Sequence, residues 1–359
     1  MKLLNFRLYI ISTLLLLAIT YSKAQRPGSA IENLIFEGGG IRGLAYPSAL
    51  AELEKNHFLD SVKRVAGTSA GAIVATLYAV GYSPNEMVEI IENLRVKSFA
   101  DGGFMFFGGT YRVINNFGWY KSDKLNSWIS YLIQAKTGKG NITFSELAAL
   151  SKEKTIFKEL YLTGTDLNNQ KAVIFGQDTY PNMEVRLAVR ISVSIPFFFQ
   201  APIIDQKGKL CVTKEEKEKG TVFTDGGIIA NFPLKIFDNE KYINKHGDSS
   251  SVFNDRSLGF RLDDDLQVEY DKKQKGLAPQ KINDIKDYIE AFYIIVIENL
   301  NRQSLTKEDW ERTVSIKTSG IGPRIRRLSK TEVDTLLANG REGALEYVKR
   351  NLNSFKNDR

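Results

Sequence analysis

Cysteine and histidine are almost absent from this sequence. Its 359 residues include one cysteine, Cys211, and two histidines, His57 and His246. A lone cysteine forms no disulfide within the chain, so a hydrophobic core must hold the fold together. Zinc sites are built mainly from closely spaced Cys and His side chains, and no H-E-x-x-H segment occurs. We therefore expect no metal ion at the functional site.

Long linkers and internal repeats are also lacking. The chain has 9 prolines, and no segment rich in Pro, Gly or Ser divides it. With 43% hydrophobic and 25% charged residues, the composition is that of a globular protein with a large core. Beyond the N-terminal segment described next, we expect a single folded domain over residues 25–359.

The first 24 residues have the pattern of a signal peptide. Lys2 and Arg7 precede an apolar run over residues 8–19, and the small residues Ser22 and Ala24 follow. The run is too short to cross a bilayer core of roughly 30 Å comfortably. We expect cleavage after Ala24 and export to the periplasm, the outer membrane or the extracellular medium. An uncleaved anchor or a buried N-terminal helix is the alternative.

Strong charge of one sign is missing from the rest of the chain. The formal net charge is +7, and the three basic residues of segment 1–24 leave +4 beyond it. This mild excess gives no indication of a nucleic-acid-binding module. A basic cluster fits either a solvated face or peripheral contact with an anionic lipid surface; its members are Arg324, Arg326, Arg327 and Lys330.

Strands alternate with helices along the chain. Short apolar runs that end in turns predict strands at 33–36, 62–66, 159–166, 171–175, 221–224 and 257–262. Apolar residues at three-to-four spacing, with small-residue runs, predict helices at 44–59, 72–80, 185–193, 282–301 and 331–352. This order predicts an α/β fold. Its mainly parallel sheet lies between helices and gathers functional groups at the carboxyl ends of the strands.

Ser69 is the candidate nucleophile. It is the central residue of Gly67-Thr68-Ser69-Ala70-Gly71, which fits G-x-S-x-G. Small neighbours are needed in this pattern because the serine sits on a tight turn between a strand and a helix. The expected strand before the pentad and helix after it agree with that role. An ordinary glycine-rich turn with an N-capping serine is the alternative.

A second glycine-rich turn precedes the serine pentad. Gly38, Gly39 and Gly40 stand at the start of a helix, where their backbone N–H groups are available to an oxyanion. The segment from Gly38 to Gly43 also matches G-x-G-x-x-G, the phosphate-binding turn of dinucleotide folds. Those folds need an acidic residue after the second strand, and here that strand ends in the serine turn. We expect an oxyanion hole and no cofactor.

A serine nucleophile needs a base within hydrogen-bond reach. Asp225 follows an apolar strand and precedes Gly226 and Gly227, which places its carboxylate at the same sheet edge as the serine. His57 is typical of a helix end. His246 would complete the chain order of a Ser-Asp-His hydrolase, but its polar surroundings are typical of a surface loop. Asp225 is the preferred base, and a triad with His246 is the alternative.

Together these motifs resemble the patatin-like phospholipase family. That family combines a glycine-rich oxyanion loop, a G-x-S-x-G turn and an Asp-Gly-Gly/Ala motif, and all three occur here in the same order. Residues 194–199 and 231–234 are similar to family segments around the active site. The resemblance covers residues 33–234 and, more loosely, 235–359. The bulky run from Phe197 to Phe199 departs from the family pattern and leaves the shape of the acyl pocket open.

The resemblance implies a serine acyl-ester hydrolase of the phospholipase A, lysophospholipase or esterase type. Ser69 would attack the acyl carbonyl, Asp225 would accept the proton, and water would hydrolyse the acyl-enzyme. Lipid or phospholipid acyl esters are the expected partners, and a catalytically silent lipid-binding module is the alternative. The supporting motif residues are Arg42, at a position that is basic in the family, and Gly43, Gly67, Gly71, Gly226 and Gly227.

Residues 98–119 mix aromatic side chains with glycines. Such a segment fits a mobile apolar cover over an acyl-binding site. It fits equally an irregular connection that packs on the core.

Overall fold

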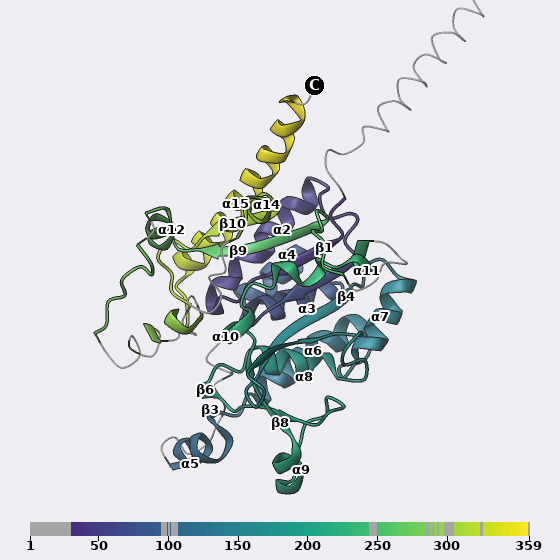
Figure 1. Cartoon of the computed structure of the whole chain (residues 1–359), viewed down its shortest axis with the longest axis vertical. Helices are drawn as coiled ribbons and strands as arrows, with labels where there is room; N and C mark the ends of the chain where they lie inside the picture. Colours follow the sequence, from purple (N-terminus) through teal and green to yellow (C-terminus); the bar gives the residue numbers. More distant parts are fainter. Residues whose placement is uncertain are drawn as a thin grey trace, which may run out of the picture.

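The structure is a computed structural model that describes residues 30–94, 99, 101, 107–243, 250–273, 275–283, 288, 291–292, 294–297, 305–323 and 326–357. The expected signal peptide, His246 and Arg324 lie outside these residues. The described part is built around one large twisted sheet with helices packed against it (Figure 1).

Within the described residues the large sheet has eight strands in the order β10-β9-β1-β2-β4-β8-β7, with β5 paired to β4 beside this path. The strands from β10 to β4 are parallel, whereas β5, β7 and β8 pair antiparallel. The predicted α/β fold with a mainly parallel sheet is confirmed. The bounds are β1 (Asn33–Phe36), β2 (Arg64–Gly67), β4 (Glu159–Asp166), β5 (Lys171–Phe175), β7 (Ile203–Ile204), β8 (Thr221–Asp225), β9 (Ser257–Asp263) and β10 (Thr313–Lys317). A separate parallel pair joins β3 (Gly118–Tyr120) to β6 (Phe197–Phe199).

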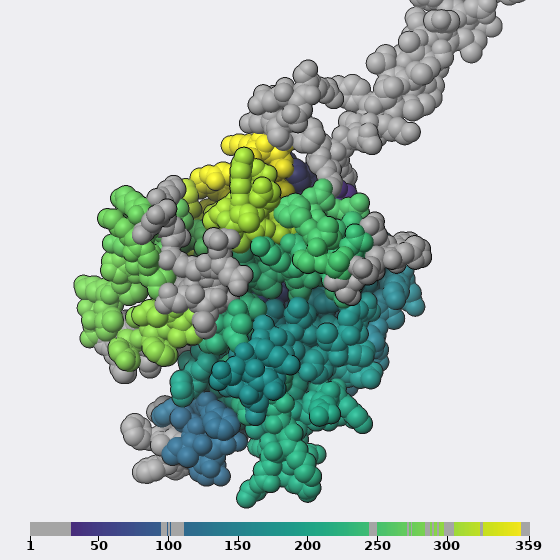
Figure 2. Space-filling model, viewed as in Figure 1, coloured from purple at the N-terminus to yellow at the C-terminus, as the bar shows by residue number. Residues whose placement is uncertain are grey.

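Helices connect and cover these strands. α15 packs against α2 and β10, and α3 packs against β1 and β2, while α5 and α9 protrude at the lower end in Figure 2. Within the described residues, no helix combines the length and apolar content needed to cross a membrane. The bounds are η1 (Gly40–Ala45), α2 (Tyr46–Lys55), α3 (Ala70–Ala79), α4 (Pro84–Glu92), α5 (Phe107–Asn116), α6 (Asp123–Thr137), α7 (Phe144–Glu153), α8 (Val185–Ser192), α9 (Lys214–Lys219), α10 (Gly227–Ala230), η3 (Leu234–Phe237), α11 (Glu240–Ile243), α12 (Asp265–Lys272), α14 (Lys307–Glu311) and α15 (Lys330–Asn357).

The helix predicted at 44–59 is the clearest correction. The segment divides into the 3-10 turn η1 and the α-helix α2, which has Pro47 in its first turn and ends at Lys55. His57 adopts a left-handed backbone with φ 62°, and the amide of Phe58 donates back to the carbonyl of Leu53. This hydrogen bond closes the C-terminal end of α2, because a residue with a left-handed backbone cannot continue an α-helix. His57 is therefore a helix-end residue, as expected.

Two other predictions fall partly outside the described residues. In segment 282–301, residues 282–283 are irregular, whereas residues 288, 291–292 and 294–297 are helical. In segment 98–119, the described residues form α5 and β3, and Phe99 packs on Trp128 with ring centroids 5.2 Å apart. The described part of segment 98–119 is thus more regular than either interpretation expected.

The core lies between the parallel strands and the helices that connect them. All four residues of β1 are buried, and Phe36 stacks on Phe260 of the neighbouring β9 with centroids 4.7 Å apart. Tyr46 of α2 tilts against the same Phe36 ring. Burial of such rings stabilises the fold by roughly 2 kcal/mol each. The strand that leads into the glycine turn is therefore fixed on both sides.

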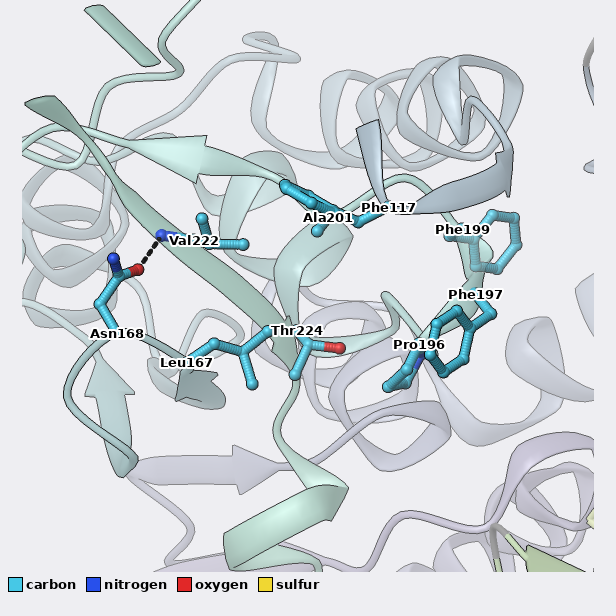
Figure 3. Close-up of a pocket in the computed structure, with 9 residues that line it drawn as sticks. All are labelled: Phe117, Leu167, Asn168, Pro196, Phe197, Phe199, Ala201, Val222 and Thr224. Atoms are coloured by element: carbon cyan, nitrogen blue, oxygen red, sulfur yellow. Dashed lines mark hydrogen bonds between the residues drawn. The ribbon is translucent and has the colours of Figure 1, made fainter. Parts of the chain in front are cut away.

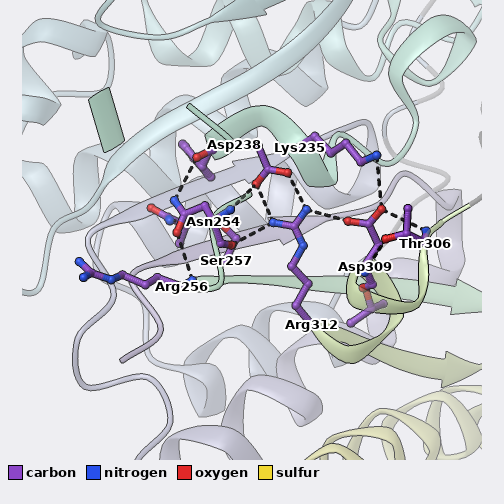
Figure 4. Close-up of polar contacts among 11 residues, drawn as sticks. Lys235, Asp238, Asn254, Arg256, Ser257, Thr306, Asp309 and Arg312 are labelled. Atoms are coloured by element: carbon purple, nitrogen blue, oxygen red, sulfur yellow. Dashed lines mark hydrogen bonds and ion pairs between the residues drawn. The ribbon is translucent and has the colours of Figure 1, made fainter. Parts of the chain in front are cut away.

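A buried ion cluster joins the segment after η3 to the last strand of the sheet (Figure 4). Arg312, with a side chain 5% exposed, donates to both carboxylate oxygens of Asp238 at 2.6 Å. It also donates to Asp309 at 2.7 Å and to the carbonyl of Asn254 at 3.0 Å. Lys235 approaches Asp309 from the surface. The cluster positions the chain that leaves the Asp225 motif.

Arg312→Ala should lower the free energy of unfolding by about 3–5 kcal/mol, because it leaves the buried carboxylate of Asp238 without its cation and that of Asp309 with only Lys235. Lys219→Ala is the matched control, because the Lys219–Glu215 pair is exposed and should contribute less than about 1 kcal/mol. Urea unfolding of both variants measures the difference. An Arg312 variant as stable as the Lys219 variant would show that the cluster does not hold these segments.

Candidate active site

Ser69 stands between β2 and α3 in a backbone conformation that is unusual for a serine. Its φ is 51° and its ψ is −120°, outside the regions that non-glycine residues normally occupy. The turn is closed from both sides. A Cβ on Gly67 would lie 2.3 Å from the carbonyl oxygen of Gly71, and a Cβ on Gly71 would lie 2.5 Å from that of Phe36. Both glycines are therefore needed for this strand-to-helix turn.

The structure brings Ser69 and Asp225 into direct contact. Ser69 Oγ donates a hydrogen bond of 2.7 Å to Oδ2 of Asp225, although the residues are 156 positions apart. Asp225 ends β8, and Ser69 follows β2; β4 lies between these strands in the sheet. Asp225 is 0% exposed and Ser69 is 5% exposed. A hydroxyl and a carboxylate thus share a closed environment at one edge of the sheet.

Backbone and side-chain hydrogen bonds fix Asp225 in this position. Its second oxygen, Oδ1, accepts from the amide of Gly227 at 2.7 Å. Its own amide donates to the carbonyl of Ser194 at 2.9 Å, and its carbonyl accepts from Thr165 Oγ1 at 2.8 Å. Both carboxylate oxygens and both main-chain groups have partners, so the carboxylate is held facing the serine.

The glycine turn lies against the serine. A Cβ on Gly38 would be 3.2 Å from Cβ of Ser69. The Gly38 amide donates to the carbonyl of Asn231 at 3.0 Å, and Asn231 Nδ2 donates to the Gly38 carbonyl at 3.1 Å. This differs from the expectation for Gly38, because its amide is already engaged. In the described part of the chain, no acceptor engages the amides of Gly39 and Gly40.

The family of the chain follows from a comparison with family models. The model described as "Patatin-like phospholipase" matches residues 34–238, which is more than half of the chain. The chain belongs to the patatin-like phospholipase family. The resemblance that the motifs indicated is confirmed, and the matched region contains the glycine turn, Ser69 and Asp225.

The relatives of this patatin-like protein align with different fractions of its chain. YqhO of Bacillus subtilis (strain 168) is 34% identical over 218 residues, or 58% of this chain and 67% of YqhO. Probable lipid hydrolase 463L of invertebrate iridescent virus 6 is 27% identical over 232 residues, or 64% of this chain and 70% of the viral protein. The crystal structure of VipD from Legionella pneumophila matches with a TM-score of 0.56 at 15% identity, covering 90% of this chain and 68% of VipD. The last likeness shows the fold alone.

The remaining motif residues of this patatin-like domain support the two turns. Arg42 Nε donates to the carbonyl of Gly39 at 3.2 Å. A Cβ on Gly43 would lie 2.9 Å from Cβ of Ala70, the residue after Ser69. Gly226 is more crowded still, since its Cβ would lie 2.2 Å from Thr163 Oγ1. Their contacts keep the turns together.

Sequence reasoning did not identify Ser192 as a site residue. The amide of Ser69 donates to Ser192 Oγ at 3.0 Å, so the end of α8 holds the backbone of Ser69. The neighbouring Ser194 carbonyl accepts from both Thr224 Oγ1 and the Asp225 amide, at 2.7 and 2.9 Å. Ser194 begins the segment 194–199 that is similar to the family, whereas Ser192 lies before that segment and had no sequence signal of its own.

Among the described residues, neither a histidine nor a metal-binding cluster accompanies the Ser69–Asp225 pair. The side chain of His57 is 71% exposed and faces Asp60 at 3.4 Å. His246 lies outside the described residues. Within the described residues, no group of three or more His, Cys, Asp or Glu side chains is arranged to hold a metal ion.

Burial changes the acidity of Asp225. Removal from water raises the pKa of its carboxyl group from 3.8 to about 7, although hydrogen bonds from Ser69 and Gly227 act in the opposite direction. Loss of water disfavours the charged form, whereas these two donors favour it. A group that titrates near neutral pH is suited to accept and return a proton at that pH.

A protonated Asp225 cannot accept a proton, so kcat/KM for a soluble acyl ester should fall about tenfold per pH unit below about pH 7 and level off above it. Histidine also titrates in this range. His57→Ala and His246→Ala are therefore the controls, and both should keep the acidic limb. Initial rates from about pH 5 to about pH 9 provide the measurement. Loss of the limb in either histidine variant would contradict the assignment to Asp225.

Proposed function

We propose that this protein is a serine lipid acyl hydrolase in which Ser69 is the nucleophile and Asp225 is the general base. The observation that carries the proposal is the buried 2.7 Å hydrogen bond between them. Its setting supports the same role, because the strained turn orients the serine and three further hydrogen bonds hold the aspartate.

The proposed reaction has two steps. In the first, Asp225 takes the hydroxyl proton while Ser69 Oγ bonds to the acyl carbon. The tetrahedral intermediate then collapses, the ester C–O bond breaks, and the leaving alcohol receives the proton from Asp225. In the second, Asp225 takes a proton from water, which attacks the acyl-enzyme and releases a carboxylic acid. The proton returns to Ser69 as it leaves.

Negative charge develops on the carbonyl oxygen in both steps and needs hydrogen-bond donors. A cavity of about 20 Å³ adjoins Gly39, Gly40 and Arg42. This is room for about one water-sized group. We assign it to the oxyanion, with the amides of Gly39 and Gly40 as donors. The Gly38 amide is not assigned a donor role, because it is bonded to Asn231.

The proposed substrates are acyl esters of lipids or phospholipids. Membership of a phospholipase family supports this class, and one relative is named a probable lipid hydrolase. We further propose that segment 1–24 directs export to the periplasm, the outer membrane or the medium. The protein would then meet lipid from outside the cytoplasm through peripheral contact with a membrane.

Asp225→Asn and Ser69→Ala should each lower kcat by at least about 10⁴-fold, because each removes one member of a pair that acts together. Asn keeps the shape of Asp225 and an oxygen that can accept from Gly227, so the fold should remain. His246→Ala should change kcat by less than about twofold, whereas a triad enzyme would lose several orders of magnitude. Release of fatty acid from a chromogenic ester measures all three variants.

Each contrary result has its own meaning. An active Asp225→Asn variant would contradict the dyad. An inactive His246→Ala variant that remains folded by circular dichroism would support a triad in its place. Vesicle binding by a wild-type protein that releases no fatty acid would support a lipid-binding module.

A further inference from the structure

An open cavity of about 400 Å³ beside β8 is separate from the Ser69–Asp225 pair (Figure 3). Val222 and Thr224 of β8 line it. Successive side chains of a strand point to opposite faces, so Asp225 faces away from this cavity. The surface that lies over the pair belongs instead to the described residues of segment 282–301.

Two aliphatic side chains of segment 282–301 lie against the active site. Ile294 and Ile297 line the cavity of about 20 Å³ together with the glycine turn. Ile297 Cδ1 lies 3.5 Å from the position that a Cβ on Gly227 would take, and the amide of Gly227 donates to Asp225. One side of this segment therefore covers both the cavity assigned to the oxyanion and the turn that holds the carboxylate.

Another side of the same segment is apolar as well, and it is exposed to solvent. Residues 288, 291–292 and 294–297 are helical. At helical spacing, Tyr288, Phe292 and Ile295 fall on one face, where they are 58%, 58% and 48% exposed. We call these three residues the outer face. A helix that is apolar on several sides normally lies in a core or against lipid. Large exposed apolar groups on one face mark an interaction surface.

Exposed cations follow the other wall of the small cavity. Pro323 lines this cavity, and its carbonyl accepts from the amide of Ile41 at 3.4 Å. Arg327 and Lys330, which come shortly after Pro323 in the chain, are both exposed. The chain around the cavity thus presents apolar groups from one segment and cations from another. This combination is complementary to a surface that contains both hydrocarbon and anionic headgroups.

We propose that the outer face, with Arg327 and Lys330, docks this protein on a phospholipid surface that contains anionic headgroups. The inference rests on the proposed function, because a lipid acyl hydrolase takes its substrate from such a surface. An α-helix with its side chains is about 10 Å across. Lipid on the outer face would therefore lie about one helix diameter from the cavity that Ile294 and Ile297 line.

The double variant Phe292→Ser, Ile295→Ser tests the apolar contact, in a Ser69→Ala background that leaves the vesicles intact. Cosedimentation with vesicles of equimolar phosphatidylcholine and phosphatidylglycerol measures binding. Loss of two apolar side chains from the contact should weaken binding at least about tenfold. Tyr131→Ser, Ile156→Ser is the matched control, because these side chains are 70% and 55% exposed and lie outside the outer face. The control should bind as the parent does.

The double variant Arg327→Ala, Lys330→Ala tests the charge contact in the same background. Each cation near an anionic lipid surface contributes about fivefold in binding. The variant should therefore bind the mixed vesicles about 10- to 30-fold more weakly, and should bind vesicles of phosphatidylcholine alone as the parent does. Lys214→Ala, Lys219→Ala is the matched control, because both lysines are exposed on α9.

Binding and turnover separate this inference from the proposed function. Vesicle binding with the expected pattern among the variants, by a wild-type protein that releases no fatty acid, would defeat the hydrolase proposal alone. Fatty-acid release from vesicles at equal rates with and without the Phe292→Ser, Ile295→Ser change would defeat the docking surface alone.

Unchanged vesicle binding in either test variant would overturn the inference. So would a wild-type dimer, found by sedimentation equilibrium, that Phe292→Ser, Ile295→Ser converts to a monomer, since the outer face would then bind a second copy of this chain. If circular dichroism shows that this variant does not fold, Tyr288→Ser replaces it. That single change should weaken binding at least about threefold, and an unchanged affinity would be equally contrary.

Discussion

A buried carboxylate that bonds to a serine hydroxyl is the constraint on which the active-site structure depends. Asp225 is fully buried, and its two oxygens accept from Ser69 and from the amide of Gly227. Removing a carboxylate from water is unfavourable, and these two donors offset that cost only in part, so its pKa rises to about 7. The same imbalance makes the group able to exchange a proton near neutral pH. The burial of Asp225 therefore determines both the cost of its charged form and the pH at which it exchanges a proton.

The glycines of the motifs follow from the close approach of three chain segments. The serine turn leaves no space for side chains at Gly67 and Gly71, and Gly40 has a φ of 55° with the carbonyl of Pro323 where a Cβ would be. These approaches bring Ser69, Asp225 and the glycine turn close to one another. The unfavourable backbone of Ser69 is kept because the strand before it and the helix after it are both packed in the core.

Local patterns were sufficient for the elements that carry Ser69 and Asp225, whereas the long-range hydrogen bonds that support these residues were not predictable. The strand before Asp225 and the turn around Ser69 could be predicted because each has its own signature within ten residues. The bond from the Gly38 amide to Asn231 could not, since these residues are 193 positions apart and the bond depends on α10. The cavity beside β8 was also missed, because its walls come from segments that no local pattern connects.

Covalent labelling of Ser69 tests the central claim most directly. The protein would be incubated with a long-chain fluorophosphonate, and the modified residue would be identified by peptide mass spectrometry. We expect one phosphonyl group, attached to Ser69, and a rate of labelling that falls sharply when Asp225 is replaced by Asn. Absence of labelling in the folded wild-type protein, attachment to another residue, or an unchanged rate in the Asn variant would contradict the account.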